Sequence, residues 1–232
     1  MKKLSGVAGI VAGALVLAVS VPLVGQDLQQ KLAAGKQAAA ANQQALRSYA
    51  WLEKVELSLK GEVKSTKVSS CRYGPDGQVQ KTPVVEPPPP QQQRGLKGKV
   101  IAKKTGEMKE ELESAAALVQ QYVPPSPDKI QVVMNAGTAS LAQAGPGAVA
   151  LKFPGYVKAG DGLSLTFDTN VKTLRRIDVA TWLEKPSDTV TFQVVMQSLP
   201  DGTDYPGAIT LAIPGSNIEV RITNSNYQKL AQ

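Results

Sequence analysis

The sequence predicts an α+β protein in which one antiparallel sheet is combined with a few helices. From Thr138 onward, short segments alternate apolar and polar residues with a period of two, and turn residues separate them. No helical pattern interrupts these segments, which indicates strands joined by short turns and not a parallel sheet with crossover helices. Two amphipathic helical patterns precede them in the first 123 residues. Together these observations favour a curved antiparallel sheet with helices on one face.

The composition excludes several kinds of active site. The chain has 232 residues, no histidine and one cysteine, Cys71. Nucleophiles activated by histidine and metals bound by histidine are therefore excluded. A single cysteine allows neither an internal disulfide nor a cysteine-ligated metal site. The remaining chemistry would need paired carboxylates or a Ser–Lys pair, but most aspartates of the second half lie at predicted turns. We therefore expect no enzymatic activity, no cofactor and no metal.

Residues 1–25 predict a signal peptide or a membrane anchor. Lys2 and Lys3 precede an uncharged, mostly apolar run from Leu4 to Gly25, the order that secretory signals show. The run is also long enough to span a bilayer. Its many small residues weaken a spanning helix, so a cleaved signal is favoured over an anchor. Residues 26–232 are then expected as one exported domain in the periplasm or cell envelope.

A helix and a strand are predicted next. Residues 27–54 carry apolar side chains at helical spacing, and Asp27 suits the start of a helix. Alternation from Val55 to Val63 then predicts a half-buried antiparallel strand, which we expect to continue to Arg72. The turn residues 74–77 separate it from a partner strand over 78–85.

The following segment is rich in proline and then in basic residues. Residues 86–93 contain four prolines and three glutamines, which predict an exposed extended insertion, either a spacer or a ligand for a polyproline-binding partner. A run of five basic residues without an acid comes next, and we expect a solvated strand or loop face there. It consists of Arg94, Lys97, Lys99, Lys103 and Lys104. No aromatic residue is interleaved to stack on bases, so we expect no nucleic acid. Contact with an anionic membrane surface or an acidic partner is the alternative to simple solvation.

Two more helices and a series of strands complete the pattern. An apolar stripe predicts a helix over 107–123 that ends at the prolines 124 and 125, and a short helix is predicted over 127–135. Strands are predicted around residues 149–153, 163–167, 177–183, 190–196, 209–213 and 218–222. Their spacing of ten to fifteen residues is typical of an antiparallel meander.

The apolar face of such a sheet needs a cover. The sheet can close into a barrel, fold on itself as a sandwich, or curve around helices. The two amphipathic helices favour the third arrangement. A curved sheet with helices laid across its mouth encloses an apolar cavity, and cavities of this kind hold lipids or acyl chains.

Some segments resemble known families. A helix that ends near Leu46, Arg47, Ser48 and Tyr49 runs directly into an amphipathic strand. It is followed later by the hairpin pattern Asp168-x-x-x-Lys172-x-Leu174-x-Arg176-x-Asp178-Val179. This order resembles the periplasmic outer-membrane lipoprotein carriers and receptors (LolA/LolB-like). The resemblance implies an incomplete antiparallel β-barrel with a helical lid over an apolar cavity. The Tyr49-Ala50-Trp51 start and the turn from Arg72 to Gly77 are also similar to uncharacterised exported proteins, and that resemblance implies no function.

The sequence thus predicts a protein that binds a lipid or a lipoprotein acyl chain between sheet and helices. The expected lining residues are Leu57, Leu59, Phe167, Val179, Phe192, Val194 and Met196 from the strands, and Met108, Leu112 and Val119 from the lid. An ordinary packed core requires the same side chains. The alternative is a cell-envelope protein–protein interaction module without a ligand cavity. Its contacts would be the proline-rich insertion, the basic run and the sheet edges.

Overall fold

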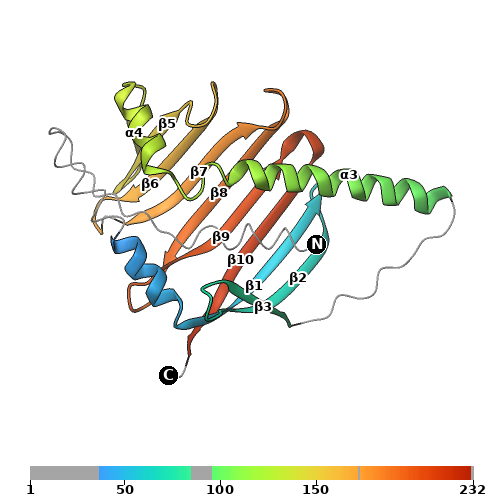
Figure 1. The fold of residues 1–232 in the computed structure, drawn as a ribbon, viewed down its shortest axis with the longest axis horizontal. Helices are drawn as coiled ribbons and strands as arrows, with labels where there is room; N and C mark the ends of the chain where they lie inside the picture. The colour runs from blue at the N-terminus through green and yellow to red at the C-terminus, as the bar shows by residue number, and fades with distance from the viewer. Residues whose placement is uncertain (1–36, 85–95, 172, 231–232) are drawn as a thin grey trace.

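A computed structural model describes residues 37–84, 96–171 and 173–230, with the backbone alone over 96–102. Ten strands of these residues form one antiparallel sheet (Figure 1). The strands are β1 Tyr49–Leu59, β2 Glu62–Tyr73, β3 Val79–Pro83, β4 Ser140–Gly145, β5 Ala148–Pro154, β6 Gly162–Asp168, β7 Leu174–Trp182, β8 Thr189–Ser198, β9 Asp204–Ile213 and β10 Ile218–Lys229. The predicted signal or anchor over 1–25 and the proline-rich insertion over 86–93 lie outside the described residues.

The sheet is open, and the first and last strands of the sequence, β1 and β10, pair with each other in its middle. Its order is β3-β2-β1-β10-β9-β8-β7-β6-β5-β4, and every neighbouring pair is antiparallel. The meander from β5 to β10 confirms the sequence prediction, whereas β4 is a strand that the sequence pattern did not predict. The β1–β10 pairing is the one contact between strands distant in sequence, and β3 and β4 are the two edges.

Two rows of apolar residues cross seven strands on one face, which we call the inner face. Cross-strand pairing aligns the first row as Phe153, Leu163, Val179, Phe192, Leu211, Val220 and Leu57. The second row runs parallel to it as Leu151, Leu165, Ile177, Val194, Ile209, Ile222 and Val55. On β2 the same rows reach Ser65 and Lys67, so the apolar face ends there. This alternation is why the inner face must be covered.

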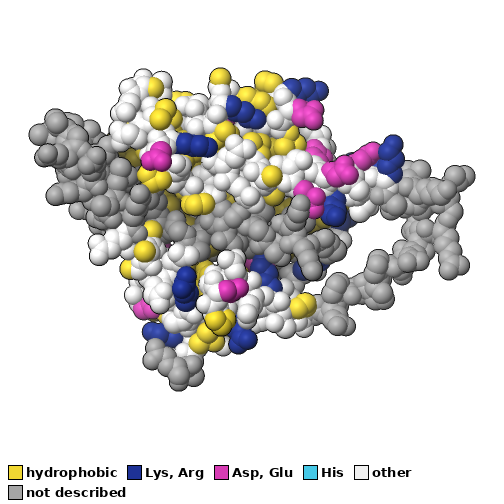
Figure 2. All heavy atoms as spheres, in the orientation of Figure 1, with side chains coloured by type: hydrophobic (Ala, Val, Ile, Leu, Met, Phe, Trp, Pro, Cys, Tyr) yellow, Lys and Arg dark blue, Asp and Glu magenta, His cyan; other side chains and the backbone are white. Residues whose placement is uncertain are grey.

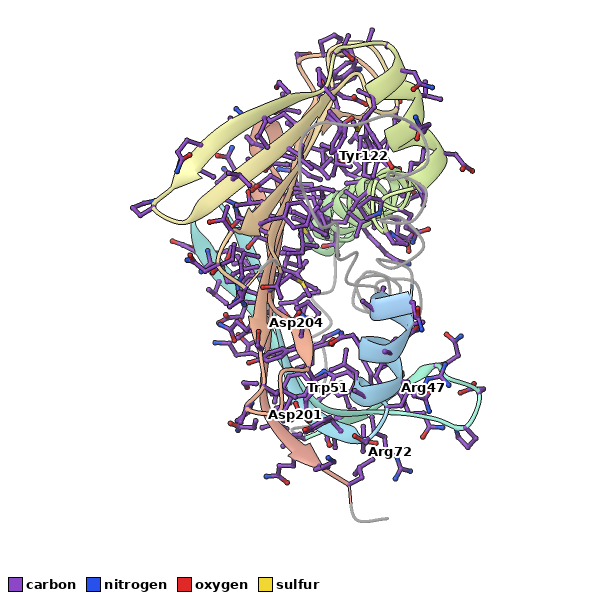
Figure 3. The ribbon with its side chains drawn as sticks, turned by 90° about the vertical axis from the view of Figure 1, so that its left-hand side faces the viewer. Arg47, Trp51, Arg72, Tyr122, Asp201 and Asp204 are labelled. Atoms are coloured by element: carbon purple, nitrogen blue, oxygen red, sulfur yellow. The ribbon has the colours of Figure 1, made fainter. Side chains whose placement is uncertain are left out.

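Three helices of the described residues lie on the inner face: a helix over 37–46, α3 (Leu96–Val119) and α4 (Pro127–Asn135) (Figures 1 and 3). Helix α3 buries Leu112, Ala115, Ala116 and Val119, which recur at the helical spacing of three and four residues. In α4, the buried residues are Ile130 and Val133. These side chains and the inner-face residues form one apolar cluster. A 3-10 turn, η1 (Pro214–Ser216), joins β9 to β10.

The predicted helix over 27–54 is wrong at its C-terminal end. The structure ends the helix at residue 46 and begins β1 at Tyr49. From Tyr49 the buried residues alternate with a period of two, and β1 pairs along its length with β2 and β10. Hydrogen bonding on both sides outweighs the helical propensity of the leucine, glutamate and lysine of residues 52–54.

The prediction of one continuous strand from Val55 to Arg72 is also wrong. The chain turns at Lys60 and Gly61, and β1 and β2 form a hairpin with this two-residue loop. Both loop residues have positive φ, 54° and 79°, as a type I′ turn requires. In the sequence, Gly61 stands at an apolar position of the alternation. A glycine is compatible with either a strand or a tight turn, so the alternation does not reveal the turn.

The basic run was predicted as a strand or loop, but α3 begins at Leu96 and includes its last four lysines. The predicted helix over 107–123 is therefore longer at its start and ends at Val119. Lysine is a good helix former, which explains why the helix extends through this run. Helix α4 has the predicted bounds, and Ser126 caps its N-terminus through the Lys129 N–H. Within the described residues, no helix is both long and apolar enough to cross a membrane.

Polar contacts attach the helix over 37–46 to the sheet. The Asn42 side-chain amide donates to the backbone carbonyl of Asp204 and accepts from its N–H, both at 2.7 Å. The Tyr49 hydroxyl donates to Asp201 at 2.5 Å, directly after the helix. This bond, together with the Thr203 N–H, lowers the pKa of Asp201 to about 2. The start of β9 therefore fixes both the helix and the strand that follows it.

We predict opposite effects of alanine at two glycines that both have free space around the missing side chain. Gly61→Ala forces a Cβ into a left-handed conformation and should lower the free energy of unfolding by about 1–2 kcal/mol. Gly106→Ala lies inside α3 and should raise it by up to about 1 kcal/mol. Urea unfolding of the two variants and the wild type measures both changes. Equal effects of the same sign would contradict the turn or the helix.

Candidate functional site

The inner face brings together all ten predicted lining residues. Seven of them are buried in the apolar cluster: Leu112, Val119, Phe167, Val179, Phe192, Val194 and Met196. The other three, Leu57, Leu59 and Met108, are half-buried and pack against its edge. Beneath α3 and α4 the inner face is thus filled by side chains. The ten residues therefore differ in the exposed surface that they offer to a ligand.

Burial changes along the two apolar rows. On β8, β9 and β10, the aligned residues from Val190 to Ile222 are at most 6% exposed. On the next strand, β1, the aligned residues Val55, Leu57 and Leu59 are half-buried. In the described part of the chain, α3 and the helix over 37–46 lie on the same side of the sheet, apart from each other (Figure 3). The apolar stretch of β1 is therefore the least covered part of the rows on β8–β10 and β1.

Charged and polar residues continue the inner face of β1 beyond this apolar stretch. Glu53 lies two residues from Val55, and its side chain is 4% exposed. Lys81 of β3 donates to both of its carboxylate oxygens, at 2.5 and 2.7 Å. Asn224 of β10 pairs directly with Glu53 in the strand register and is 5% exposed. Its amide nitrogen donates to the Pro206 carbonyl at 2.9 Å. We call Glu53, Lys81, Asn224 and Trp51 the polar cluster.

Aromatic rings border the polar cluster. Trp51 stacks on Tyr227 with ring centroids 5.5 Å apart and an angle of 9°, and Tyr73 lies 5.4 Å from Trp51. A β-bulge brings Tyr227 to this face, because the β1–β10 register shifts between residues 50 and 52 and Asn226 has φ of 53°. Burial raises the pKa of the Tyr227 hydroxyl, so it stays protonated at neutral pH.

Cys71 lies beside the polar cluster on β2, opposite Trp51. Its side chain has no exposed surface, and its thiol contacts the Ser69 carbonyl at 3.8 Å. Burial, with the nearby Glu53 carboxylate, raises the pKa of the thiol to about 12. A thiol with this pKa is almost entirely protonated at neutral pH and is a poor nucleophile.

A second buried polar group fixes the end of α3. Tyr122, which is fully buried, donates its hydroxyl to Asp161 and contacts the Thr181 hydroxyl at 2.8 Å. Asp161 also accepts from the Lys158 N–H at 2.8 Å. Burial and the bond to Asp161 raise the pKa of Tyr122. Since every member has a partner, we assign this group a structural role.

The predicted anionic-partner residues are only partly described. Arg94 lies outside the described residues, and Lys97 and Lys99 are described as helix backbone alone. Lys103 and Lys104 are exposed on α3, and Lys103 approaches Glu107 at 3.8 Å. Figure 2 shows acidic side chains gathered along α3. The prediction of an anionic partner remains a prediction.

Two grooves lie on the surface, away from the inner face of β1. One, of about 740 Å³, lies on the opposite, polar face of the sheet, where Lys152, Asp178, Gln193, Glu219 and Arg221 line it. The other, of about 750 Å³, lies beside α3 and is lined by five carboxylates. Those carboxylates are Glu107, Glu110, Glu111, Glu184 and Asp188. Among the described residues, no three cysteine, aspartate or glutamate side chains come together in a group that could hold a metal ion.

Sequence analysis did not identify the polar cluster. Glu53 occupies the same register position as Trp51, Val55 and Leu57, and a charged residue in an apolar register is the signal that could have found it. That signal was hidden because residues 27–54 were predicted as a helix. Lys81 and Asn224 carried no such signal, since only strand pairing brings them to Glu53.

We predict that Tyr122→Phe lowers the free energy of unfolding by about 1–3 kcal/mol, because the buried Asp161 carboxylate loses one of its donors. Urea unfolding measures the change. Tyr205→Phe is the control, because the Tyr205 hydroxyl bonds Gln197 on an exposed part of the sheet. Its effect should stay within about 0.5 kcal/mol. Equal effects of the two variants would contradict the assigned structural role.

We also predict that Cys71 is unreactive in the folded protein. A chromogenic disulfide reagent at pH 8 should modify no thiol in the native chain and one thiol per chain in urea, because folding both buries the thiol and keeps it protonated. Rapid modification of the native chain would show that β2 is open at this position.

Among solved structures, the similarity to this chain is weak. No family model matches the sequence, and no curated protein matches it. The crystal structure of a DUF1329 family protein from Desulfovibrio piger matches 82% of this chain and 90% of that chain, with 10% identity and a TM-score of 0.35. A similarity at this level assigns no family to the chain.

Proposed function

We propose that the protein is an exported, non-enzymatic binder of a lipid or lipoprotein acyl chain, held against the inner face of β1. The observation that carries this proposal is the change in burial along the apolar rows. The apolar residues of β8 to β10 are buried, whereas Val55, Leu57 and Leu59 follow one another half-buried on β1. At the other end of the second row, Leu151 is also half-buried.

The proposed binding surface is a narrow strip. Val55, Leu57 and Leu59 follow one another at every second residue of a strand, so the strip is roughly 13 Å long at 3.3 Å per residue. Met108 of α3 is half-buried and packs against the same apolar cluster. An acyl chain laid along the strip would remove apolar surface from water, at about 25 cal/mol per Å².

Features of the sequence support export and the proposed class of ligand. The basic residues followed by an uncharged run at the start favour export. The resemblance to the lipoprotein carriers and receptors, which bind acyl chains between a curved sheet and helices, supports the ligand class. The open sheet with helices on one face is compatible with that arrangement.

A cell-envelope protein–protein interaction module is the second candidate. The filled inner face beneath α3 and α4 favours it, because five of the predicted lining residues there are core residues of β6 to β8. These are Phe167, Val179, Phe192, Val194 and Met196. In that case the polar groove on the other face of the sheet would be a contact surface.

We predict that Leu57→Lys weakens acyl-chain binding at least tenfold, because it places a charge on the apolar strip. The full chain is purified without detergent and titrated with a dansyl-labelled fatty acid, and native mass spectra report any lipid that copurifies. Val63→Lys is the matched control, since Val63 lies on the same hairpin but is 55% exposed. Leu57→Phe, which fills the strip without a charge, should weaken binding while the protein stays folded.

Two results would contradict the proposal: no saturable binding of either a fatty acid or a monoacylglycerol to the wild type, or equal weakening by Leu57→Lys and Val63→Lys. Either result would favour the interaction module, and the next experiment would be a search for protein partners.

A further inference from the structure

We propose that the polar cluster at the end of the strip recognises an uncharged, hydroxyl-bearing head group of the bound amphiphile, such as that of a monoacylglycerol. This inference rests on the proposed function, because it assigns the polar end of the same ligand. The residues that carry it are Trp51, Glu53, Lys81 and Asn224.

Unpaired polar atoms are the first argument. Four buried side-chain atoms of the described residues have no hydrogen-bond partner, and two belong to the polar cluster: the indole N–H of Trp51 and the amide oxygen of Asn224. Trp51 is 7% exposed and Asn224 is 5% exposed. The other two atoms are hydroxyls of Thr166 and Thr173, near the β6–β7 hairpin. Buried polar atoms without partners are rare, and each calls for an explanation.

The two unpaired atoms have complementary chemistry. The indole nitrogen can only donate, and the amide oxygen can only accept. Asn224 pairs with Glu53 in the β1–β10 register, and Trp51 lies two residues from Glu53 along β1 on the same face, a backbone spacing of roughly 6.6 Å. A hydroxyl group accepts one hydrogen bond and donates another. A head group with hydroxyls therefore offers a partner to an atom of each kind.

The charge of the polar cluster is the second argument. Glu53 and Lys81 are bound to each other through both carboxylate oxygens, so their charges cancel. A ligand carboxylate placed here would meet the Glu53 carboxylate without a free cation of the cluster to compensate it. Bringing an uncompensated charge into a buried site is costly. The polar cluster therefore selects against free fatty acids and in favour of neutral head groups.

The order of residues along β1 is the third argument. From Leu59 the inner face passes through Leu57 and Val55 to Glu53 and Trp51, so apolar side chains give way to polar ones within one strand. An amphiphile has the same order, from tail to head. At the polar end of this order, three aromatic rings pack against one another, those of Trp51, Tyr73 and Tyr227 (Trp51 is labelled in Figure 3). The β-bulge at Asn226 is what aims Tyr227 at this position.

The test compares two amphiphiles with the same acyl chain, monolauroylglycerol and laurate, by calorimetric titration of the full chain at pH 8. We expect monolauroylglycerol to bind about tenfold more tightly than laurate. Trp51→Phe keeps the aromatic ring but removes the indole N–H, and should weaken monolauroylglycerol binding roughly three- to tenfold. Trp182→Phe is the control, since the only other tryptophan lies against Lys158 at the far part of the sheet.

A charge variant gives an independent readout. Glu53→Gln leaves the Lys81 ammonium without its counter-charge, so the preference should reverse and laurate should bind more tightly than monolauroylglycerol. Circular dichroism checks that this variant is folded. If Glu53→Gln is not folded, the titration of Trp51→Phe tests the head-group assignment, because that substitution preserves the stacked rings.

The outcomes separate the two proposals. If neither amphiphile binds the wild type, the proposed function fails. If both bind with equal affinity and Trp51→Phe has no more effect than Trp182→Phe, the acyl-chain function stands and the head-group assignment is wrong. A preference of the wild type for laurate would also overturn the assignment.

Discussion

The apolar face of the sheet is the constraint on which the rest of the structure depends. Two rows of aliphatic and aromatic side chains cross seven strands on one face. Each fully buried side chain of this kind stabilises the fold by about 1.5–3 kcal/mol, so the face must be covered. The helices cover it unequally. Helix α3 seals the rows over β8 to β10 with Leu112, Ala115 and Val119, while the apolar residues of β1 stay half-buried.

Polar contacts determine where the helices lie on that face. Tyr122 joins the segment after α3 to Asp161 and Thr181, and Asn42 joins the helix over 37–46 to the backbone of Asp204. An apolar stripe alone could slide along an apolar sheet, because the hydrophobic effect is not directional. Hydrogen bonds to fixed partners remove that freedom, since each buried donor or acceptor must be satisfied in place. The two anchors thus hold two helices apart from each other on the same side of the sheet.

The polar cluster is a cost to stability that the fold does not require. A buried ion pair such as Glu53–Lys81 is often no more stabilising than apolar residues of the same shape. It also lies beside two unpaired polar atoms and a β-bulge that redirects Tyr227. Local costs of this kind concentrate at functional sites. The cluster and the adjacent apolar strip therefore form the most informative surface of the described residues, in contrast to the fully paired group around Tyr122.

The sequence alone determined the strands β5 to β10, their meander and helix α4, because period-two alternation and turn residues are local signals. It did not predict β4. Local signals failed at three places. Residues 49–54 form a strand because β10 pairs with them. Gly61 lies in a turn in which both loop residues adopt positive φ. Residues 96–106 belong to α3, which begins earlier than predicted. The seven predicted lining residues of the strands share the inner face, but their burial depended on helix positions. Only the β1–β10 and β2–β3 pairings brought Glu53, Asn224 and Lys81 together, since contacts between residues distant in sequence leave no periodic pattern to read.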